Sequence, residues 1–596
     1  MKFEEFAKFL AEVEGISGRN EVTVLLAEFL QKIPPEEVSS VMYLLQGRLV
    51  PNFIDLEFGF SQKSGLRALS EVSEDEGKVK DLFATLGDVG LVAEQVLEKK
   101  SDSTKKISVS EVYEILMSIA QASGKGSQEA KLTLFKDLLL KLDPLSVRYV
   151  TRVVMGSLRI GFSDKTVLDA LSWAKTGDKR LRKSLDIAYG AKADIGELAK
   201  LVLVTKVEDL PEVLSNIKFV PGVPVASKLV ERESSAASTF ERMGKCIVQP
   251  KLDGLRCQIH LLEQPNAAGH KVEIFSRNME SLTAVFPDIV EAVQKLPVKS
   301  VIIDSEAIGY DVENATYLPF QQTIQRRRKY NIDETVEAIP IRAMAFDLMY
   351  LNGEDLSRED VESRLAKLEQ ILGNSDQQVI QQLETKTMDT EEELDTYFKE
   401  KIGMGLEGVI VKKLGTTYDP GTRNFDWIKL KANTQSDMVD TVDAVVLGYF
   451  TGRGGRAAFG VGAILVGLYN PDDDKFYSVA KVGTGMTESQ LAEIKRDLEP
   501  LIAKSQPENV VVNKILHPDV WVQPEIVVEI DADEVTRSPG HTAGVGTQAR
   551  FETEASTKGL SLRFPRLKIW KRDKKAAQAT TVAEVLRLYE LRVKGI

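Results

Sequence analysis

The sequence predicts a multidomain protein with an all-α N-terminal domain, an α/β (α+β) middle domain and a small C-terminal β-barrel. A chain of 596 residues is too long for one hydrophobic core. Apolar residues at helical spacing dominate its first part, and mixed strand and helix patterns follow. Short strand-like runs separated by glycine-rich or acidic turns make up the rest. We therefore expect domains at residues 1–212, 213–436 and 437–596.

The first domain is predicted from stripes of apolar residues on one helix face. Phe3, Phe6, Leu10 and Val13 form the first stripe, and similar stripes recur at residues 112–119, 130–142 and 146–158. The turn-rich segment 218–225 contains two prolines, which forbid a continuous helix. A new domain should begin near this segment.

The middle domain is predicted from strand-like and helical runs that alternate along the chain. The expected strands lie at residues 255–262, 271–276, 301–308 and 342–350, and the expected helices lie at residues 361–372 and 390–401.

The last domain is predicted from short strands at residues 441–450, 461–469, 476–482 and 525–530. Capping boxes at residues 487–490 and 581–584 predict the starts of two helices. Several short strands with one interrupting helix are typical of an oligonucleotide-binding (OB-fold) barrel.

Composition narrows the possible partners and the compartment. No apolar run reaches the length of a membrane span, and the acidic start is unlike a signal peptide, so we expect a cytoplasmic protein without a membrane partner. Two cysteines and four scattered histidines predict no structural metal site. The net charge of −12 disfavours nucleic acid unless one surface is locally basic.

Basic residues gather in three places that could form such a surface. Arg148, Arg152 and Arg159 recur along one helical stretch, and Arg326 and Arg327 open the run RRRK. Residues 563–575 hold seven basic side chains against one acid. Each of these groups could contact DNA or could simply solvate a surface, and charge alone does not decide between the two.

Lys251 is the residue around which the chemistry of the chain is organised. It stands in the sequence QPKLDGLR at residues 249–256, between two strand-like runs. A lysine becomes a covalent nucleophile when burial or nearby cations favour its neutral amine. Lys-x-Asp-Gly alone occurs by chance in roughly one chain in seven of this length, so a solvated turn is the alternative.

Polar residues in apolar surroundings suggest a polyphosphate site. Glu306 interrupts a β-rich run and Glu407 precedes one, and two such carboxylates could hold Mg²⁺ (or Mn²⁺) on a phosphate chain. The alternative is that each acid points to solvent. Lys429 and Lys431 alternate along a strand and share one face, where they repel each other unless an anion lies between them.

The order of these segments resembles the nucleotidyltransferase motifs of ATP-dependent DNA ligases. The matching segments are KLDGLR at 251–256, FSRN at 275–278, DSE at 304–306, AFDLMY at 345–350, EGVIVK at 407–412 and WIKLK at 427–431. RFPR at 563–566, with RDK at 572–574, resembles the final motif of the family. WVQP at 521–524 and ADEVTRSP at 532–539 also resemble family segments. RIGFS at 159–163 and VLDAL at 167–171 resemble the DNA-binding domain of archaeal-type replicative ligases.

The resemblance implies an enzyme that seals nicks between a 5′-phosphate and a 3′-hydroxyl in duplex DNA, in replication, repair and recombination. Lys251 would attack the α-phosphate of ATP and become lysyl-AMP, the AMP would pass to the 5′-phosphate, and the 3′-hydroxyl would displace it. The family implies a monomer, and a sliding clamp is a candidate partner.

The resemblance also implies a role for each site residue. Phe346 would stack on adenine, Arg277 and Glu306 would contact the ribose and phosphate region, and Lys429 and Lys431 would grip the α-phosphate. Glu306 and Glu407 would place the metal ion. The other expected nucleotide contacts are Gln249, Arg256, Arg566, Arg572 and Lys574.

Two details of the resemblance carry expectations of their own. Family members mostly have glutamate where this chain has Gln249, whose carbonyl can still accept a hydrogen bond from the adenine amine. The family also moves its barrel during the reaction, and residues 433–439 are the expected hinge.

Three other protein classes share part of these features. RNA ligases and capping guanylyltransferases share the Lys-x-Asp-Gly core, but the helical domain has no obvious place in them. An NAD-dependent ligase lacks support because the cysteines of its zinc module are missing. A non-catalytic DNA-binding scaffold would not need the full set of motif cations.

Overall fold

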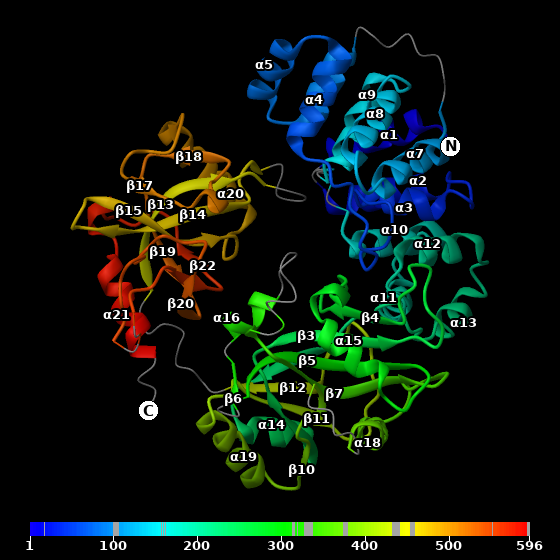
Figure 1. The fold of residues 1–596 in the computed structure, drawn as a ribbon, viewed down its shortest axis with the longest axis vertical. Coiled ribbons are helices and arrows are strands. Elements are labelled where there is room, and N and C mark those ends of the chain that lie inside the picture. The colour runs from blue at the N-terminus through cyan, green and yellow to red at the C-terminus, as the bar shows by residue number, and fades with distance from the viewer. Residues whose placement is uncertain are drawn as a thin grey trace. The chain divides into compact units, whose positions relative to one another are not determined.

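The computed structural model shows two compact units, each described here by itself (Figure 1). One unit comprises residues 1–158 and 162–432, and the second is built mainly from residues 433–596. The structure describes residues 1–16, 18–98, 107–156, 158, 160, 162–312, 316–318, 320–326, 336, 338–373, 379–431, 441–452, 459–550, 552 and 554–592. The predicted hinge at 433–439 lies outside these residues. The predicted three-domain division stays a prediction.

The N-terminal part of the first unit is helical, as predicted. Its helices are α1 Phe3–Glu14, α2 Arg19–Leu30, α3 Val38–Leu45, α4 Gln62–Ser73, α5 Glu76–Leu86, α6 Val89–Leu97, α7 Val109–Gln121, α8 Ser127–Leu139, α9 Pro144–Val154, α10 Asp164–Thr176, α11 Arg182–Ala191, α12 Ile195–Val204 and α13 Leu210–Ser215. The stripe from Phe3 to Val13 is buried. Residues 112–119 lie inside α7, which Ser108 and Glu111 cap reciprocally.

A buried charge network joins α9 to α1 and α6, and it corrects one prediction. The Arg152 guanidinium pairs with Asp88 at 3.1 Å and with Glu14 at 3.0 Å, and the side chains of Arg152 and Asp88 are each only 3% exposed. Arg148 pairs with Glu14 at 2.7 Å and with Glu94 at 3.4 Å. The predicted DNA contact through Arg152 is therefore wrong, because its guanidinium is buried and paired with two carboxylates inside the helical domain. Arg148 is committed to the same network, and Arg159 lies outside the described residues.

Two β-sheets form the rest of the first unit. One has the strand order β1-β12-β11-β2-β10, and the other has the order β4-β3-β5-β7-β8 with β6 on β5 and β9 on β7. The strands are β1 Leu229–Glu233, β2 Cys246–Lys251, β3 Leu255–Leu261, β4 Val272–Ser276, β5 Val301–Asp311, β6 Thr316–Tyr317, β7 Ile341–Leu351, β8 Glu354–Asp355, β9 Ile380–Gln382, β10 Lys386–Met388, β11 Gly408–Lys413 and β12 Arg423–Lys431. The helices are α14 Ala236–Met243, α15 Pro287–Gln294, α16 Phe320–Thr323, α18 Val361–Leu372 and α19 Glu391–Gly403.

Helices cover one face of each sheet. The two remaining faces, one from each sheet, are directed toward each other. Val248 and Val411 of the first sheet pack with Leu394 of α19. Ile303 of the second sheet packs with Leu368 of α18. Because side chains alternate along a strand, the residues next to these point to the opposite face of their sheet. Gln249, Lys251 and Lys412 on one sheet, and Asp304 and Glu306 on the other, therefore belong to the facing sides.

The proline-rich segment after α13 contains no helix, as predicted, and it is bound along strand β3. Gly222 N donates to His260 Nδ1 at 3.0 Å, and the backbone of Val225 exchanges two hydrogen bonds with the Gln258 amide. Burial lowers the pKa of His260 to about 3, which keeps the ring neutral and able to accept. This part of the chain is therefore a fixed strap rather than a loose linker.

The second unit is β-rich, and this confirms the predicted fold class. Its larger sheet has the order β16-β18-β13-β14-β15-β17, with β19 on β13 and β22 on β19, and β20 pairs with β21. The elements are β13 Val442–Phe450, β14 Ala463–Asn470, β15 Lys475–Val482, α20 Glu488–Leu498, β16 Ile502–Ala503, β17 Val510–Val511, β18 Val520–Val522, β19 Val527–Asp531, β20 Glu534–Ser538, β21 Gly559–Arg563, β22 Arg566–Ile569 and α21 Val582–Arg592. Both predicted capping boxes are present.

Over the part of the chain that the structure describes, no helix is both long enough and apolar enough to cross a membrane.

Replacing Arg152 with methionine should destabilise the helical domain by about 3 kcal/mol, because Asp88 would be left as a buried charge without its partner. Thermal unfolding measures this change, and Arg180→Met, which removes a side chain that is 64% exposed, is the matched control. A variant that kept its melting temperature but lost affinity for DNA would instead support the original DNA contact.

Candidate active site

Lys251 ends strand β2 where the chain crosses from one sheet to the other. Strand β2 belongs to the five-stranded sheet, and β3, which begins four residues later, belongs to the other sheet. A side chain at Gly254 would meet the Ala307 carbonyl oxygen at 2.5 Å, so only glycine allows this close approach to β5. Gly254 N also donates to Glu306 Oε1 at 3.2 Å. The crossing therefore brings Lys251 near Glu306.

Three lysines and one glutamate gather at this end of the five-stranded sheet. Gly408 of β11 is paired with both Lys251 and Lys431, which places Glu407 between the two lysines. Glu407 forms an ion pair with Lys251 and accepts from Lys431 Nζ at 3.1 Å. Although burial acts to raise it, these two lysines hold the pKa of Glu407 below its ordinary value. One carboxylate thus forms ion pairs with two ammonium groups.

Lys429 shares a strand face with Lys431, as predicted. The side chain of Lys429 forms no hydrogen bond or ion pair within the described part of the chain, although the backbone of this residue pairs with β1 and β11. Partial burial, and after it the charges of Lys431 and Lys251, lower the pKa of Lys429. A group of three lysines with one carboxylate between them is suited to bind an anion.

Glu306 is an acid of the facing sheet that lies close enough to Lys251 for the lysine charge to act on it. It sits opposite Arg256 in the pairing of β3 with β5. Burial raises the pKa of Glu306 to about 7, because Lys251 and Arg256 offset the loss of solvent only in part. A bound cation would remove this penalty and favour the ionised carboxylate.

Arg256 is held firmly by a network that the sequence did not reveal. Its guanidinium donates to both oxygens of Asp304, at 3.1 and 2.5 Å, and to the Lys228 carbonyl at 3.0 Å. The Tyr418 hydroxyl also donates to Asp304, at 3.0 Å. The same guanidinium lies 5.3 Å from the centroid of the Phe346 ring. The Arg256 guanidinium is therefore fixed in position next to the Phe346 ring.

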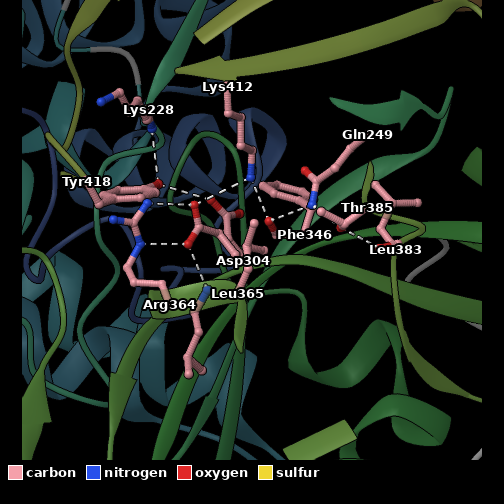
Figure 2. Close-up of polar contacts among 12 residues, drawn as sticks. Lys228, Gln249, Asp304, Phe346, Arg364, Leu365, Leu383, Thr385, Lys412 and Tyr418 are labelled. Carbon is pink, nitrogen blue, oxygen red and sulfur yellow. Dashed lines mark hydrogen bonds and ion pairs between the residues drawn. The ribbon is translucent and has the colours of Figure 1, made fainter. Parts of the chain in front are cut away.

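Phe346 stands between the two sheets, where a second charged network fixes its backbone (Figure 2). Lys412 Nζ donates to the Phe346 carbonyl at 2.6 Å and pairs with Asp347 at 3.5 Å. Arg364 pairs with Asp347 at 2.8 Å, and all three charged side chains are fully buried. The Phe346 ring is partly exposed and lies 6.3 Å from Trp427, edge to face. The partly exposed ring is thus held in place by Arg256, Lys412 and Trp427.

Gln249 lies two residues before Lys251 on the same strand face, and it is almost fully buried. Its amide nitrogen donates to the Phe346 carbonyl and to the Thr385 hydroxyl. Sequence reasoning missed Thr385, Arg364, Tyr418 and Lys228, because nothing local marks them. Asp304 and Asp347 lie inside segments that resemble family motifs. For these two residues, a charged side chain within an apolar strand was the feature of the sequence that indicated a special role.

Two predicted residues lie apart from this cluster. Arg277 is exposed on the turn after β4, and within the described structure no hydrogen bond or ion pair joins its side chain to the residues around Lys251. Arg326 is 1% exposed and donates to the Ile339 carbonyl and to Asp288, each at 2.9 Å. The predicted DNA contact through Arg326 is therefore wrong, because its guanidinium is used to close the local fold. Arg327 lies outside the described residues.

The cations of the last motif lie in the second unit, and each has an acidic partner there. Arg566 pairs with Asp533 at 2.6 Å, and Lys574 pairs with Asp443 at 2.5 Å. Arg572 pairs with Glu529. The second unit therefore neutralises these charges with its own carboxylates.

Comparison with known families identifies the protein class. The family model described as "ATP dependent DNA ligase domain" matches residues 227–431, "DNA ligase N terminus" matches residues 2–172, and "ATP dependent DNA ligase C terminal region" matches residues 457–574. The chain belongs to the ATP-dependent DNA ligase family. Its function is therefore the ATP-dependent sealing of nicks in DNA.

Similar proteins span the whole ligase chain. A "Probable DNA ligase" of Dictyoglomus turgidum is 41% identical over 593 residues, covering 99% of this chain and 97% of the relative. A "DNA ligase" of Sulfolobus acidocaldarius is 38% identical over 614 residues, covering 100% of this chain and 98% of the relative. The solved structure titled "Pmar-Lig_PreS3" covers 95% of this chain and 98% of its own, with a TM-score of 0.50 and 16% identity, and supports the fold alone.

Replacing Lys412 of the ligase with methionine should change how stability depends on pH. Burial lowers the pKa of Lys412 from 10.5 to about 8, so between these values the unfolded chain binds a proton that the folded chain releases. Wild-type stability should therefore gain from this group as the pH rises through that window, and Lys412→Met should lack the gain. Urea unfolding across the window measures the difference.

The matched control is Lys413→Met, which removes the exposed neighbouring ammonium. Wild type and Lys412→Met should diverge as the pH rises, whereas wild type and Lys413→Met should stay parallel. Parallel curves for all three proteins would contradict the lowered pKa of Lys412.

Proposed function

We propose that Lys251 is the nucleophile with which this ligase takes up AMP. The main evidence for this proposal is the position of Lys251, which lies where the chain crosses between the sheets. There it contacts Glu407 and lies near Lys429 and Lys431. The Lys251 amine loses a proton and attacks the α-phosphorus of ATP. A nitrogen–phosphorus bond forms, the bond to the β-phosphate oxygen breaks, and pyrophosphate leaves.

Two further transfers complete the reaction. The 5′-phosphate of the nick attacks the phosphorus of lysyl-AMP and releases Lys251, which gives a DNA-adenylate. The 3′-hydroxyl then attacks the 5′-phosphorus and releases AMP. Each step is a displacement at phosphorus, so the protein contributes chiefly by aligning the groups and by neutralising charge.

The cation group would hold the phosphates during these steps. Lys429, which lacks a carboxylate partner in the described structure, and Lys431 would grip the α-phosphate. An incoming phosphate could then take over the role that Glu407 plays toward Lys251 and Lys431. Phe346 and Gln249 would bind the base, and Arg277 would approach the ribose from its turn.

The residues present fit Mg²⁺, or Mn²⁺ in its place. Within the described structure no group of three or more acidic, histidine or cysteine side chains could hold a metal ion. Mg²⁺ commonly uses one or two carboxylates together with phosphate oxygens, and Glu306 and Glu407 are those carboxylates. When bound there, the ion would neutralise charge on the phosphates of the nucleotide.

The three predicted domains would divide the work on nicked duplex DNA. Residues 1–212 would bind the duplex, with Arg159 as a candidate contact, and residues 213–436 would carry the nucleotide site, with Arg327 as another candidate. Residues 437–596 would bring Arg566, Arg572 and Lys574 to the pyrophosphate of ATP by movement about the hinge.

We further propose that the ligase works as a monomer in the cytoplasm. One chain carries every residue assigned to the three steps, so no second copy is needed to complete the site. A sliding clamp is the candidate protein partner.

Incubation with ATP labelled at the α-phosphate tests the nucleophile. Wild-type protein should acquire a covalent label that is stable to denaturation, and Lys251→Ala should lose it entirely because no other residue carries the AMP. Lys245→Ala, which removes a nearby exposed lysine, is the control and should label normally. An undiminished label on Lys251→Ala would sink the assignment.

Replacing both Arg572 and Lys574 with alanine should slow formation of lysyl-AMP by about a hundredfold, while sealing of DNA that is already adenylated changes much less. Two single-turnover assays, one for each step, separate these effects. Lys568→Ala, at an exposed position of the same motif region, is the control. Equal loss in both assays would count against a specific role of these cations toward pyrophosphate.

A further inference from the structure

The amide of Gln249 is held in one orientation by a chain of hydrogen bonds (Figure 2). Gln249 Nε2 donates to Thr385 Oγ1 at 3.0 Å and to the Phe346 carbonyl at 3.3 Å. The Thr385 hydroxyl in turn donates to the Leu383 carbonyl at 2.9 Å. Thr385 lies between strands β9 and β10, far from Gln249 in sequence, and belongs to no segment that resembles a family motif.

The partners of this amide decide which of its two ends is the nitrogen. The Phe346 carbonyl can only accept a hydrogen bond. The Thr385 hydroxyl has a single proton, which it gives to the Leu383 carbonyl, so toward Gln249 it also can only accept. Both partners therefore require an N–H group from Gln249. The carbonyl oxygen Oε1 must lie on the remaining side of the amide.

The bond to Thr385 is the stronger of the two restraints. The Phe346 carbonyl already accepts from Lys412 Nζ at 2.6 Å, and its contact with Gln249 is longer, at 3.3 Å. No hydrogen bond is donated to Gln249 Oε1 within the described part of the chain. In Figure 2 the Gln249 nitrogen faces Thr385, and the oxygen points the other way. An acceptor is thus presented on the strand face that also carries Lys251.

We propose that Thr385 determines nucleotide specificity by fixing the Gln249 amide with Oε1 toward the base. The inference rests on the proposed nucleotide site. An acceptor in this position bonds the 6-amino group of adenine, whereas the 6-oxo group of hypoxanthine or guanine would place two acceptors against each other. Thr385 is a positioning residue, because it acts on the base only through Gln249.

Gln249 and Thr385 therefore form a matched pair. A glutamate in place of Gln249 has no N–H, so it would face the Phe346 carbonyl acceptor to acceptor. The Thr385 hydroxyl would also have to leave the Leu383 carbonyl in order to donate to the carboxylate. The glutamine thus obtains its selectivity for adenine from its surroundings rather than from its own chemistry, since an amide can present either end.

Labelling of Lys251 by ATP and by ITP, both labelled at the α-phosphate and at subsaturating concentrations, tests this role. ITP presents an oxygen at the 6-position. Wild-type ligase should prefer ATP strongly. Thr385→Val keeps the shape but removes the hydroxyl, and should lower the ratio of ATP to ITP labelling by about tenfold, because only the longer bond to the Phe346 carbonyl then restrains the amide. The change should fall on the KM for each nucleotide more than on kcat.

Two further variants separate positioning from a general loss of structure. Thr385→Ser retains the hydroxyl and should keep the wild-type ratio to within about twofold. Thr387→Val makes the same chemical change at an exposed position of the adjoining strand β10, and should leave the ratio unchanged. Rescue by serine together with an altered ratio in the valine variant would support the proposal.

The outcomes distinguish this inference from the assignment on which it rests. If wild-type protein labels with ATP but Thr385→Val keeps the wild-type ratio, the role of Thr385 is overturned and the nucleophile stands. If Thr385→Val loses labelling equally with both nucleotides, Thr385 is structural and the proposal also fails. If wild-type protein takes no label from either nucleotide, the nucleophile assignment itself is overturned.

Discussion

The buried contact between Lys412 and Asp347 joins the two sheets between which the proposed nucleotide site lies. Lys412 comes from the five-stranded sheet and Asp347 from the other, and Arg364 of α18 completes the pairing from outside. Removing such charges from water is costly, and only their mutual pairing and hydrogen bonds offset that cost. The arrangement is therefore demanding in geometry, and it sets the position of the Phe346 carbonyl and of the aromatic ring attached to it.

Charge compensation is a second theme, and it appears in both units. Lys251 and Lys431 share Glu407, while Arg572 and Lys574 are paired with Glu529 and Asp443. Four cations that we propose to contact ATP are thus paired with carboxylates of their own unit. Lys429 differs, because it lacks such a partner among the described residues and its pKa is lowered. In the proposed site, a nucleotide phosphate would compete with Glu407 for Lys251 and Lys431, and it would meet Lys429 without a competing carboxylate.

Arginine shows where charge patterns in a sequence mislead. Arg152 and Arg326 stand in basic stretches, yet both are buried and satisfied by carboxylates and carbonyls. A planar guanidinium with five N–H donors can form hydrogen bonds with several segments at once. An arginine in a basic stretch can therefore be buried in the fold as readily as it can contact nucleic acid. Only the position of the acceptors, which come from distant parts of the chain, distinguishes these uses.

The sequence by itself determined the class of each region, most element positions and the family. Helix α18 and the strands near residues 255–262 and 301–308 were predictable, because side-chain periodicity is a local property. Tertiary structure alone decided that β2 and β3 belong to different sheets, so that Lys251 stands at a crossing. It also decided that Thr385 holds Gln249. Such pairings depend on which faces meet after folding, and residues far apart in sequence carry no local signal of that meeting.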